Sequence, residues 1–257
     1  MQPILRLTRW EWFRMHHRAP FLVLAGMALA IPLFSLVVVA MQLAGWLTPL
    51  GSSGYFGAAA GSLSFLSPIL AIVLSSYTHA WDLQNGTCRT LTARGASRES
   101  VIAAKSLAGA ALLLGYHLLV LAAAVIFAGA SGPHFAGWQD GTVSVLASWM
   151  VSLLYLALGI ALSHWRQSAS FTLGVGLSIV FAEAIFYPLA NALGALENWP
   201  VAEATAWTLW GIAQGLRGDS SILSAAWSVP VSIGYIAALA ILAVAAFRKF
   251  DLQAGGE

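Results

Sequence analysis

The chain has 257 residues, of which 59% are apolar and 9% are charged, and its mean hydropathy is +0.80. Soluble domains usually carry about 25% charged residues, so this composition excludes a water-soluble domain and predicts an integral membrane protein. The formal net charge is only +2, so the placement of the charges is more informative than their sum, and the single cysteine, Cys88, excludes an internal disulfide.

The first 19 residues, MQPILRLTRWEWFRMHHRA, form a basic and aromatic segment. They place Arg6, Arg9, Arg14 and Arg18 among leucines and aromatic residues, a composition typical of helices that lie in the membrane interface. We expect an interfacial helix here; the alternative is a charged flank that only orients the first span. The apolar run that follows is too long for the apolar core of a signal peptide.

Six apolar segments are long enough to cross a bilayer. A hydrocarbon core of about 30 Å requires about 20 helical residues, and lipid offers no hydrogen-bond partners to the backbone, so each segment must be helical. The sequence therefore predicts an all-α, polytopic membrane protein with one transmembrane domain over residues 1–257. The predicted spans are residues 20–44, 58–80, 106–130, 142–163, 168–192 and 229–247.

Lysine and arginine gather on one side of the predicted spans. Eleven of the twelve lie in residues 1–19, 81–105, 164–167 and 248–257, and only Arg217 lies on the other side. Because short loops rich in Lys and Arg stay in the cytoplasm, we expect both termini to be cytoplasmic, in the inner membrane of a bacterium.

The outer connections are residues 45–57, 131–141 and 193–228. In the third, Trp199-Pro200 is typical of a helix start, and we expect the helix to end at Gly215 and Gly218. This predicts a short helix that lies in, or dips into, the outer leaflet.

Gly57 and Gly61 form a GxxxG pattern at the outer start of the second span. Small residues at this spacing allow two helices to approach closely. The pattern marks either a subunit contact or a coincidence in a chain rich in Ala and Gly.

The longest polar interruption is DLQNGTCRTLTARGASRESVIAAK, residues 82–105. Asn85-Gly86 predicts a turn, and residues 87–93 can form two helical turns that Gly95 ends in the left-handed conformation. Ser97 is placed to cap the helix that leads into the third span. We expect two ordered pieces joined at Gly95, able to transmit a push; the alternative is an ordinary connection with a basic flank.

In this loop, Asp82-x-x-x-Gly86-Thr87-x-Arg89, then Gly95-x-Ser97-Arg98 and then Lys105 resemble the pattern between the second and third spans of ABC type-2 permeases. These are the membrane subunits of ATP-binding cassette exporters. The layout of the whole chain is similar too: a basic N-terminal helix, six spans, a cytoplasmic loop after the second span and an outer helical insertion between the fifth and sixth. Many members carry a second acid before the Gly-Thr and a proline where this sequence has Gly95-Ala96. Among the members, the chain looks like a half-transporter of the type V exporters.

The resemblance implies that two copies pair, as a homodimer, and that each docks an ABC ATPase through the N-terminal helix and a coupling helix at about residues 87–94. Closure of the ATPases on ATP and Mg would rock the two bundles and move an amphipathic, peptide- or lipid-like substrate out of the cytoplasm, along an interface lined by the second and fifth spans. The coupling residues that it implies are Thr87, Arg89, Thr90, Leu91, Arg94, Gly95, Ser97 and Arg98.

The energy source is expected outside this chain. No Gly-x4-Gly-Lys phosphate loop is present, so the chain is not expected to be an enzyme, to hold a cofactor or to bind nucleic acid. The second hypothesis is a six-span anchor or assembly subunit that positions a soluble or respiratory partner and transports nothing.

Glu183 is the one acid deep inside a predicted span, and intramembrane acids mark functional sites by default. It could face the substrate path and meet a cationic substrate or a proton. The alternatives are a protonated acid bonded to a neighbouring helix, or an acid exposed at an outer vestibule where Pro188 breaks the span.

The histidines and motifs predict no metal site. His79 and His117 would lie at depths roughly 15 Å apart, which excludes a haem shared between them, and His164 is expected to be a cytoplasmic flank residue. The sequence contains no HExxH, CxxC or GxSxG motif, which excludes the corresponding zinc and serine hydrolase sites.

Overall fold

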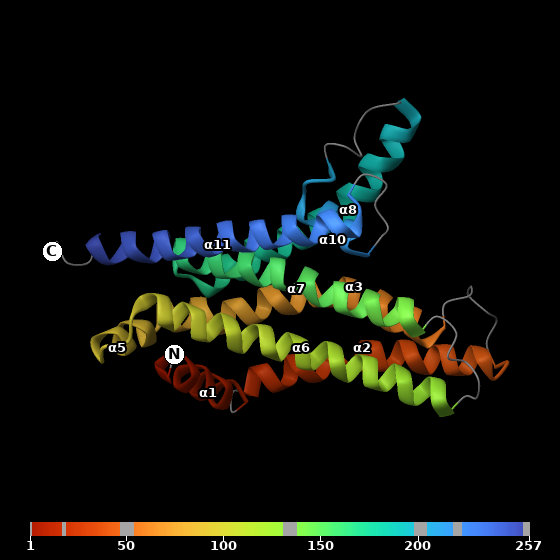
Figure 1. The fold of residues 1–257 in the computed structure, drawn as a ribbon, viewed down its shortest axis with the longest axis horizontal. Coiled ribbons are helices and arrows are strands. Elements are labelled where there is room, and N and C mark those ends of the chain that lie inside the picture. The colour runs from red at the N-terminus through yellow and green to blue at the C-terminus, as the bar shows by residue number, and fades with distance from the viewer. Residues whose placement is uncertain are drawn as a thin grey trace.

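The computed structural model describes residues 2–16, 19–46, 54–130, 138–197, 205–217 and 223–253. Within these ranges every regular element is a helix (Figure 1). Five of the described helices are long and apolar enough to cross a membrane. The protein is a polytopic helical membrane protein, as the composition predicts.

The helices follow one another in a simple order along the chain. They are α1 Gln2–His16, α2 Ala19–Leu43, α3 Tyr55–Ser75, a π-helical turn η1 Ser76–Ala80, α4 Trp81–Gln84, α5 Thr87–Ala93, α6 Arg98–Ala130, α7 Trp138–Arg166, α8 Ala169–Glu197, α10 Leu209–Arg217 and α11 Ala225–Gln253. From α3 to α4 the helix is continuous through η1.

The five long apolar helices correspond to the second to sixth predicted spans. Each is longer than the predicted span, because the polar flanks continue the helix: α7, for example, begins at Trp138 rather than Thr142. The first predicted span is α2, in which Leu29–Leu43 is the described apolar part and is by itself too short to cross. Arg18, Trp199-Pro200 and Gly218 lie outside the described residues, as do most of the first two outer connections.

Helix α7 is the centre of the bundle (Figure 1). It packs against α3, α6, α8, α10 and α11, and 67% of the residues in its most apolar stretch are buried, against 11% in α11. Close approach requires a glycine where α7 crosses α3: a Cβ at Gly159 would lie 1.9 Å from Ser75 Oγ. Because α7 occupies the centre, the helices around it, such as α11, expose much of their apolar surface, which suits a lipid environment.

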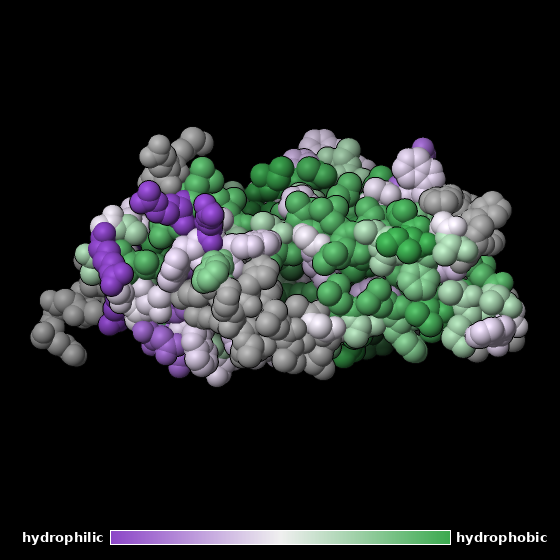
Figure 2. All heavy atoms as spheres, turned by 90° about the horizontal axis from the view of Figure 1, so that it is seen from below, coloured by the Kyte–Doolittle hydropathy of each residue, from purple (hydrophilic) through white to green (hydrophobic). Residues whose placement is uncertain are grey.

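The polar residues gather at one end of the molecule. On the face seen in Figure 2, the hydrophilic side chains lie mainly at the end that carries α1 and α5, and apolar side chains cover most of the remaining coloured surface. The C-terminal part of α11 reaches the same end, since Arg248 pairs with Glu99 at the start of α6.

Helix α10 packs into the opposite half of the bundle, against α7, α8 and α11. The helix was expected to end at Gly215 and Gly218, and it continues past Gly215 to Arg217. Gly215 instead allows α11 to approach closely: a Cβ there would lie 2.1 Å from Ser228 Oγ. At the end of α10, Arg217 donates to the Ser64 carbonyl of α3 at 3.3 Å. Helix α10 therefore contacts α11 at Gly215 and α3 at Arg217.

The expectation that Pro188 breaks the fifth span is wrong. Helix α8 continues through Pro188 to Glu197. A proline removes one backbone donor and often kinks a helix without ending it.

Candidate functional site

Helix α5 lies between two glycines in the left-handed conformation: Gly86 in the predicted turn, and Gly95, for which the sequence predicts this conformation. Gly86 has φ 71° and Gly95 has φ 89°. At the C-terminal end, Gly95 N–H donates to the Thr92 carbonyl at 3.0 Å and Ala96 N–H to the Leu91 carbonyl at 3.2 Å. These two bonds form a Schellman motif, which fixes the direction of the chain leaving a helix.

The next helix is capped as predicted. Ser97 Oγ accepts a hydrogen bond from the Ser100 backbone N–H at 3.2 Å, at the start of α6. The first turn of α6 is also tied to the end of α11. Arg248 pairs with Glu99 at 2.6 Å, and the Arg98 guanidinium lies 5.7 Å from the centre of the Phe247 ring.

One side of α5 packs on the bundle and the other faces out. Cys88 is buried, and Leu91 and Ala96 pack against the main apolar core. On the other side, Arg89 and Arg94 are exposed, and neither forms an ion pair within the described ranges. The remaining residues of the predicted coupling set are exposed (Thr90, Gly95 and Ser97) or half-buried (Thr87 and Arg98).

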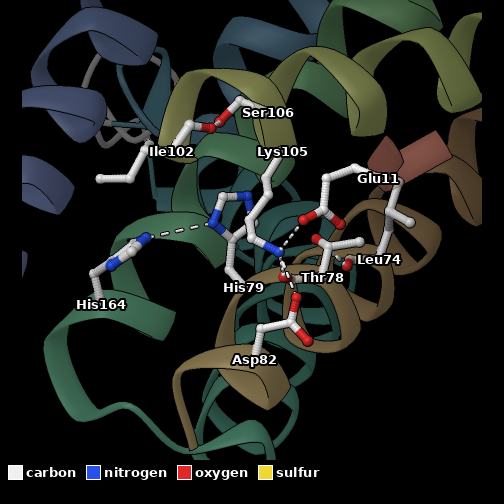
Figure 3. A network of polar contacts seen from close by, with 9 residues as sticks. All are labelled: Glu11, Leu74, Thr78, His79, Asp82, Ile102, Lys105, Ser106 and His164. Carbon is white, nitrogen blue, oxygen red and sulfur yellow. Dashed lines mark hydrogen bonds and ion pairs between the residues drawn. The ribbon is translucent and has the colours of Figure 1, made fainter. Parts of the chain in front are cut away.

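Lys105 is not part of the exposed loop, contrary to its predicted place in residues 82–105. It lies in the second turn of α6 and is 2% exposed. Its ammonium group forms an ion pair with Glu11 of α1 at 2.9 Å and a second with Asp82 of α4, and it donates to the Thr78 carbonyl at 3.0 Å (Figure 3). Glu11 and Asp82 are buried as well, at 2% and 0% exposure.

Removing one member of such a cluster has a large cost. A charge left behind in a buried site without its partner destabilises a protein by about 3–5 kcal/mol. The exposed pair of Arg248 and Glu99 belongs to a class worth about 0–1 kcal/mol. Among the ion pairs between described residues, those of Lys105 are therefore the ones whose disruption costs most.

The acceptor carbonyl of Thr78 belongs to the π-helical turn η1. Such turns are rare and occur often at functional sites, because the wider turn shifts the side chains that follow it. Here the turn directly precedes α4, which carries Asp82. Lys105 therefore binds both the turn and the acid beyond it.

A pair of buried histidines lies beside this cluster (Figure 3). His79 Nδ1 of η1 and His164 Nε2 of α7 are 3.3 Å apart, and both residues are 1% exposed. The expectation that His164 is a flank residue is therefore wrong, because the extension of α7 buries it. Its ring also contacts Phe247 of α11, with the centroids 5.0 Å apart.

These contacts connect the start of α6 with α11, α7, η1, α1 and α4. From the start of α6, Arg98 reaches Phe247, which contacts His164, which pairs with His79. Lys105 adds α1 and α4. Within the described part of the chain no group of three or more His, Cys, Asp or Glu side chains could hold a metal ion.

Glu183 lies elsewhere, in the half of the bundle that holds α10. Its carboxylate accepts a hydrogen bond from Tyr155 Oη of α7 at 2.6 Å. The backbone of Leu209 and Trp210, at the start of α10, lies close to it. The structure therefore does not bring Glu183 together with the residues around α5. Glu183 instead joins α8 to α7 through Tyr155 and lies beside the start of α10.

Comparison with known proteins gives one result. The family model "Protein of unknown function (DUF2705)" matches residues 51–253, from before α3 to the end of α11. No curated protein matches the chain. The match includes α5, Lys105, the histidine pair and Glu183, and it excludes α1 and Glu11. Because it covers more than half of the chain, the protein belongs to this DUF2705 family.

Proposed function

We propose that the protein is the permease subunit of an ATP-binding cassette exporter, which pairs with a second copy and is driven by a separate ATPase docked at α5. The observation that carries the proposal is α5 itself. It is a short helix with fixed ends, packed on the core through Cys88 and Leu91 and exposing Arg89 and Arg94.

A displacement of α5 would be transmitted to the bundle, because hydrogen bonds and packing fix both ends of the segment. Its C-terminal turn is fixed by the Schellman motif at Gly95, and the following helix is capped by Ser97. The contacts of Arg98 and Lys105 then connect it to α11, α1 and α4. A disordered connection of the same length would absorb the movement by changing its own conformation.

The proposal includes a pairing surface on the second and fifth spans, α3 and α8. Gly57, Gly61 and Phe65 are exposed along one side of α3 at intervals of four residues. Phe65 contacts Phe181 of α8, with ring centroids 6.3 Å apart, and both rings remain exposed. This continuous surface of small and aromatic residues is suited to close helix packing in a membrane.

The proposed topology has six spans and two cytoplasmic termini, with α2 as the first span and α10 as an outer re-entrant or interfacial helix. It is supported by the polar end in Figure 2, where α1 and α5 lie. On this topology α1 lies in the cytoplasmic interface of a bacterial inner membrane. Arg6, Arg9 and Trp10 are exposed on it, which suits contact with headgroups.

The substrate is proposed to be amphipathic, a peptide or a lipid, because the exposed spans are apolar. Glu183 follows two residues after Phe181 and is half-buried, so it remains a residue proposed to line the path. Replacement by Gln removes its charge and keeps an acceptor for Tyr155. Unchanged transport in that variant would exclude the role.

The test is reconstitution with an ABC ATPase whose gene neighbours this one. We expect the two to co-purify and the permease to stimulate ATP hydrolysis, and we expect Arg89→Glu with Arg94→Glu to abolish the stimulation, since both side chains are exposed and the fold should survive. Arg166→Glu, exposed at the turn between α7 and α8, is the matched control and should retain it.

Full stimulation in the double variant would exclude docking at α5. Leu91→Asp is less suitable, since Leu91 packs on the core and its loss would disturb the fold itself. An ATPase that binds without any substrate movement in vesicles would favour the anchor or assembly subunit instead.

A further inference from the structure

Three segments far apart in the sequence meet at one ammonium group. Lys105 of α6 contacts Glu11, 94 positions earlier in α1, and Asp82, 23 positions earlier in α4 (Figure 3). Asp82 precedes α5 and Lys105 follows it, so the cluster joins the two sides of residues 87–98, the proposed coupling segment. Glu11 adds the N-terminal helix at the same point.

The contact fixes α1 in a way that apolar packing could not. Apolar contact is non-directional, so a helix held by it alone can slide or rotate at low cost. A buried ion pair has a defined geometry and loses its stabilisation when one charge leaves the other. The packing of α1 on α6 therefore has one preferred register, set by Glu11 and Lys105.

We propose that Lys105 is a positioning residue that braces α1 and the coupling segment into one unit, so that the N-terminal helix moves with α5. The proposal rests on the proposed function only for the role of this connection in transport. Its structural content stands apart from it: the register of α1 on the bundle depends on the Glu11–Lys105 pair, and the base of the coupling segment depends on Asp82 and the Thr78 carbonyl.

The test is amide hydrogen exchange of the full chain in detergent, without any partner. In Lys105→Met we expect exchange in α1 to become at least tenfold faster, while exchange in the central helix α7 is unchanged. Lys105→Arg keeps the charge and should restore most of the protection. Arg248→Gln breaks the exposed ion pair at the same end and should leave α1 unchanged.

Unchanged exchange in α1 of Lys105→Met would overturn the proposal. If that variant does not fold, Glu11→Gln decides: faster exchange in α1 supports the brace, and unchanged exchange overturns it. Exchange needs no ATPase, so failure of the unaltered protein to bind one would contradict the proposed function alone.

The coupling role has its own readout once the unaltered complex transports. Glu11→Gln should lower the amount of substrate moved per ATP hydrolysed by severalfold, while the KM for ATP stays the same. A merely structural pair would lower the yield of folded protein and leave this ratio unchanged, and that result would restrict Lys105 to stabilising α1.

Discussion

Gly174 and Gly176 are separated by one residue in α8 but have different surroundings. A Cβ at Gly176 would lie 2.6 Å from Ile72 Cγ2 of α3, whereas a Cβ at Gly174 would meet nothing within 4 Å. Ile72 is fully buried, and β-branched side chains have few alternative rotamers, so it cannot move aside easily. Gly176 is therefore where α8 approaches α3.

Gly176→Ala is expected to destabilise the protein by about 1–3 kcal/mol, the usual cost of extra atoms in a packed interior. Gly174→Ala should be neutral or stabilising, since alanine is favoured over glycine within a helix by up to ~1 kcal/mol. Thermal unfolding of the two variants in the same detergent measures the difference. Equal unfolding temperatures would contradict the close approach of α8 to α3.

Among the elements, α5 shows what a local sequence can specify. Its bounds, the left-handed Gly95 and the Ser97 cap were all predicted correctly, because each depends on bonds between residues at most five positions apart. The same applies to the long apolar helices, whose length and composition identify them. Only the ends of the spans were wrong, since polar residues such as Gln139 and Asp140 of α7 can extend a helix beyond the membrane.

The partners of Lys105 and His164 were not predictable in this way. Glu11 lies in a basic flank and His164 just after a predicted span, and nothing near either residue in the sequence indicates burial. Their contacts join residues 94 and 85 positions apart, and such pairs depend on how the helices pack. The π-helical turn was missed for the same reason: the partner of its Thr78 carbonyl is Lys105, 27 positions further along the chain.

Replacing Gly95 tests whether the shape of α5 matters. Gly95→Ala meets no atom within 4 Å, so its only cost is the left-handed backbone, about 1–2 kcal/mol for a residue with a Cβ. We expect about tenfold faster tryptic cleavage at Arg89 and Arg94, because the C-terminal turn of α5 opens more often. Gly95→Asn should be cleaved more slowly than Gly95→Ala, since asparagine tolerates this conformation.

Gly115→Ala is the control, because Gly115 lies inside α6 and its added Cβ also meets nothing within 4 Å. Cleavage of the α5 segment in that variant should equal that of the unaltered protein. If Gly95→Ala were no more sensitive than Gly115→Ala, the left-handed turn would not be holding α5 in place.

For the whole molecule, the distribution of exposed surface separates two kinds of apolar side chain. Large side chains such as Leu119 of α6 and Ile241 of α11, 59% and 69% exposed, suit disordered lipid chains. On α3 the exposed positions are instead Gly57 and Gly61, which leave the backbone open, and Phe65 one turn further along. A second helix gains contact from such a surface, whereas lipid gains little.

A cysteine at Gly61 tests whether a second copy covers that surface. In a symmetric pair, residues near the twofold axis meet their own counterparts, and a Cβ at Gly61 meets nothing within 4 Å in the single chain. Cys88 is 2% exposed, so the background reaction is low. We expect Gly61→Cys to form a dimer with a short thiol crosslinker in native membranes, and Leu119→Cys to remain monomeric. Equal crosslinking at both positions would indicate random collision, and crosslinking at Leu119 alone would place the pairing surface on α6.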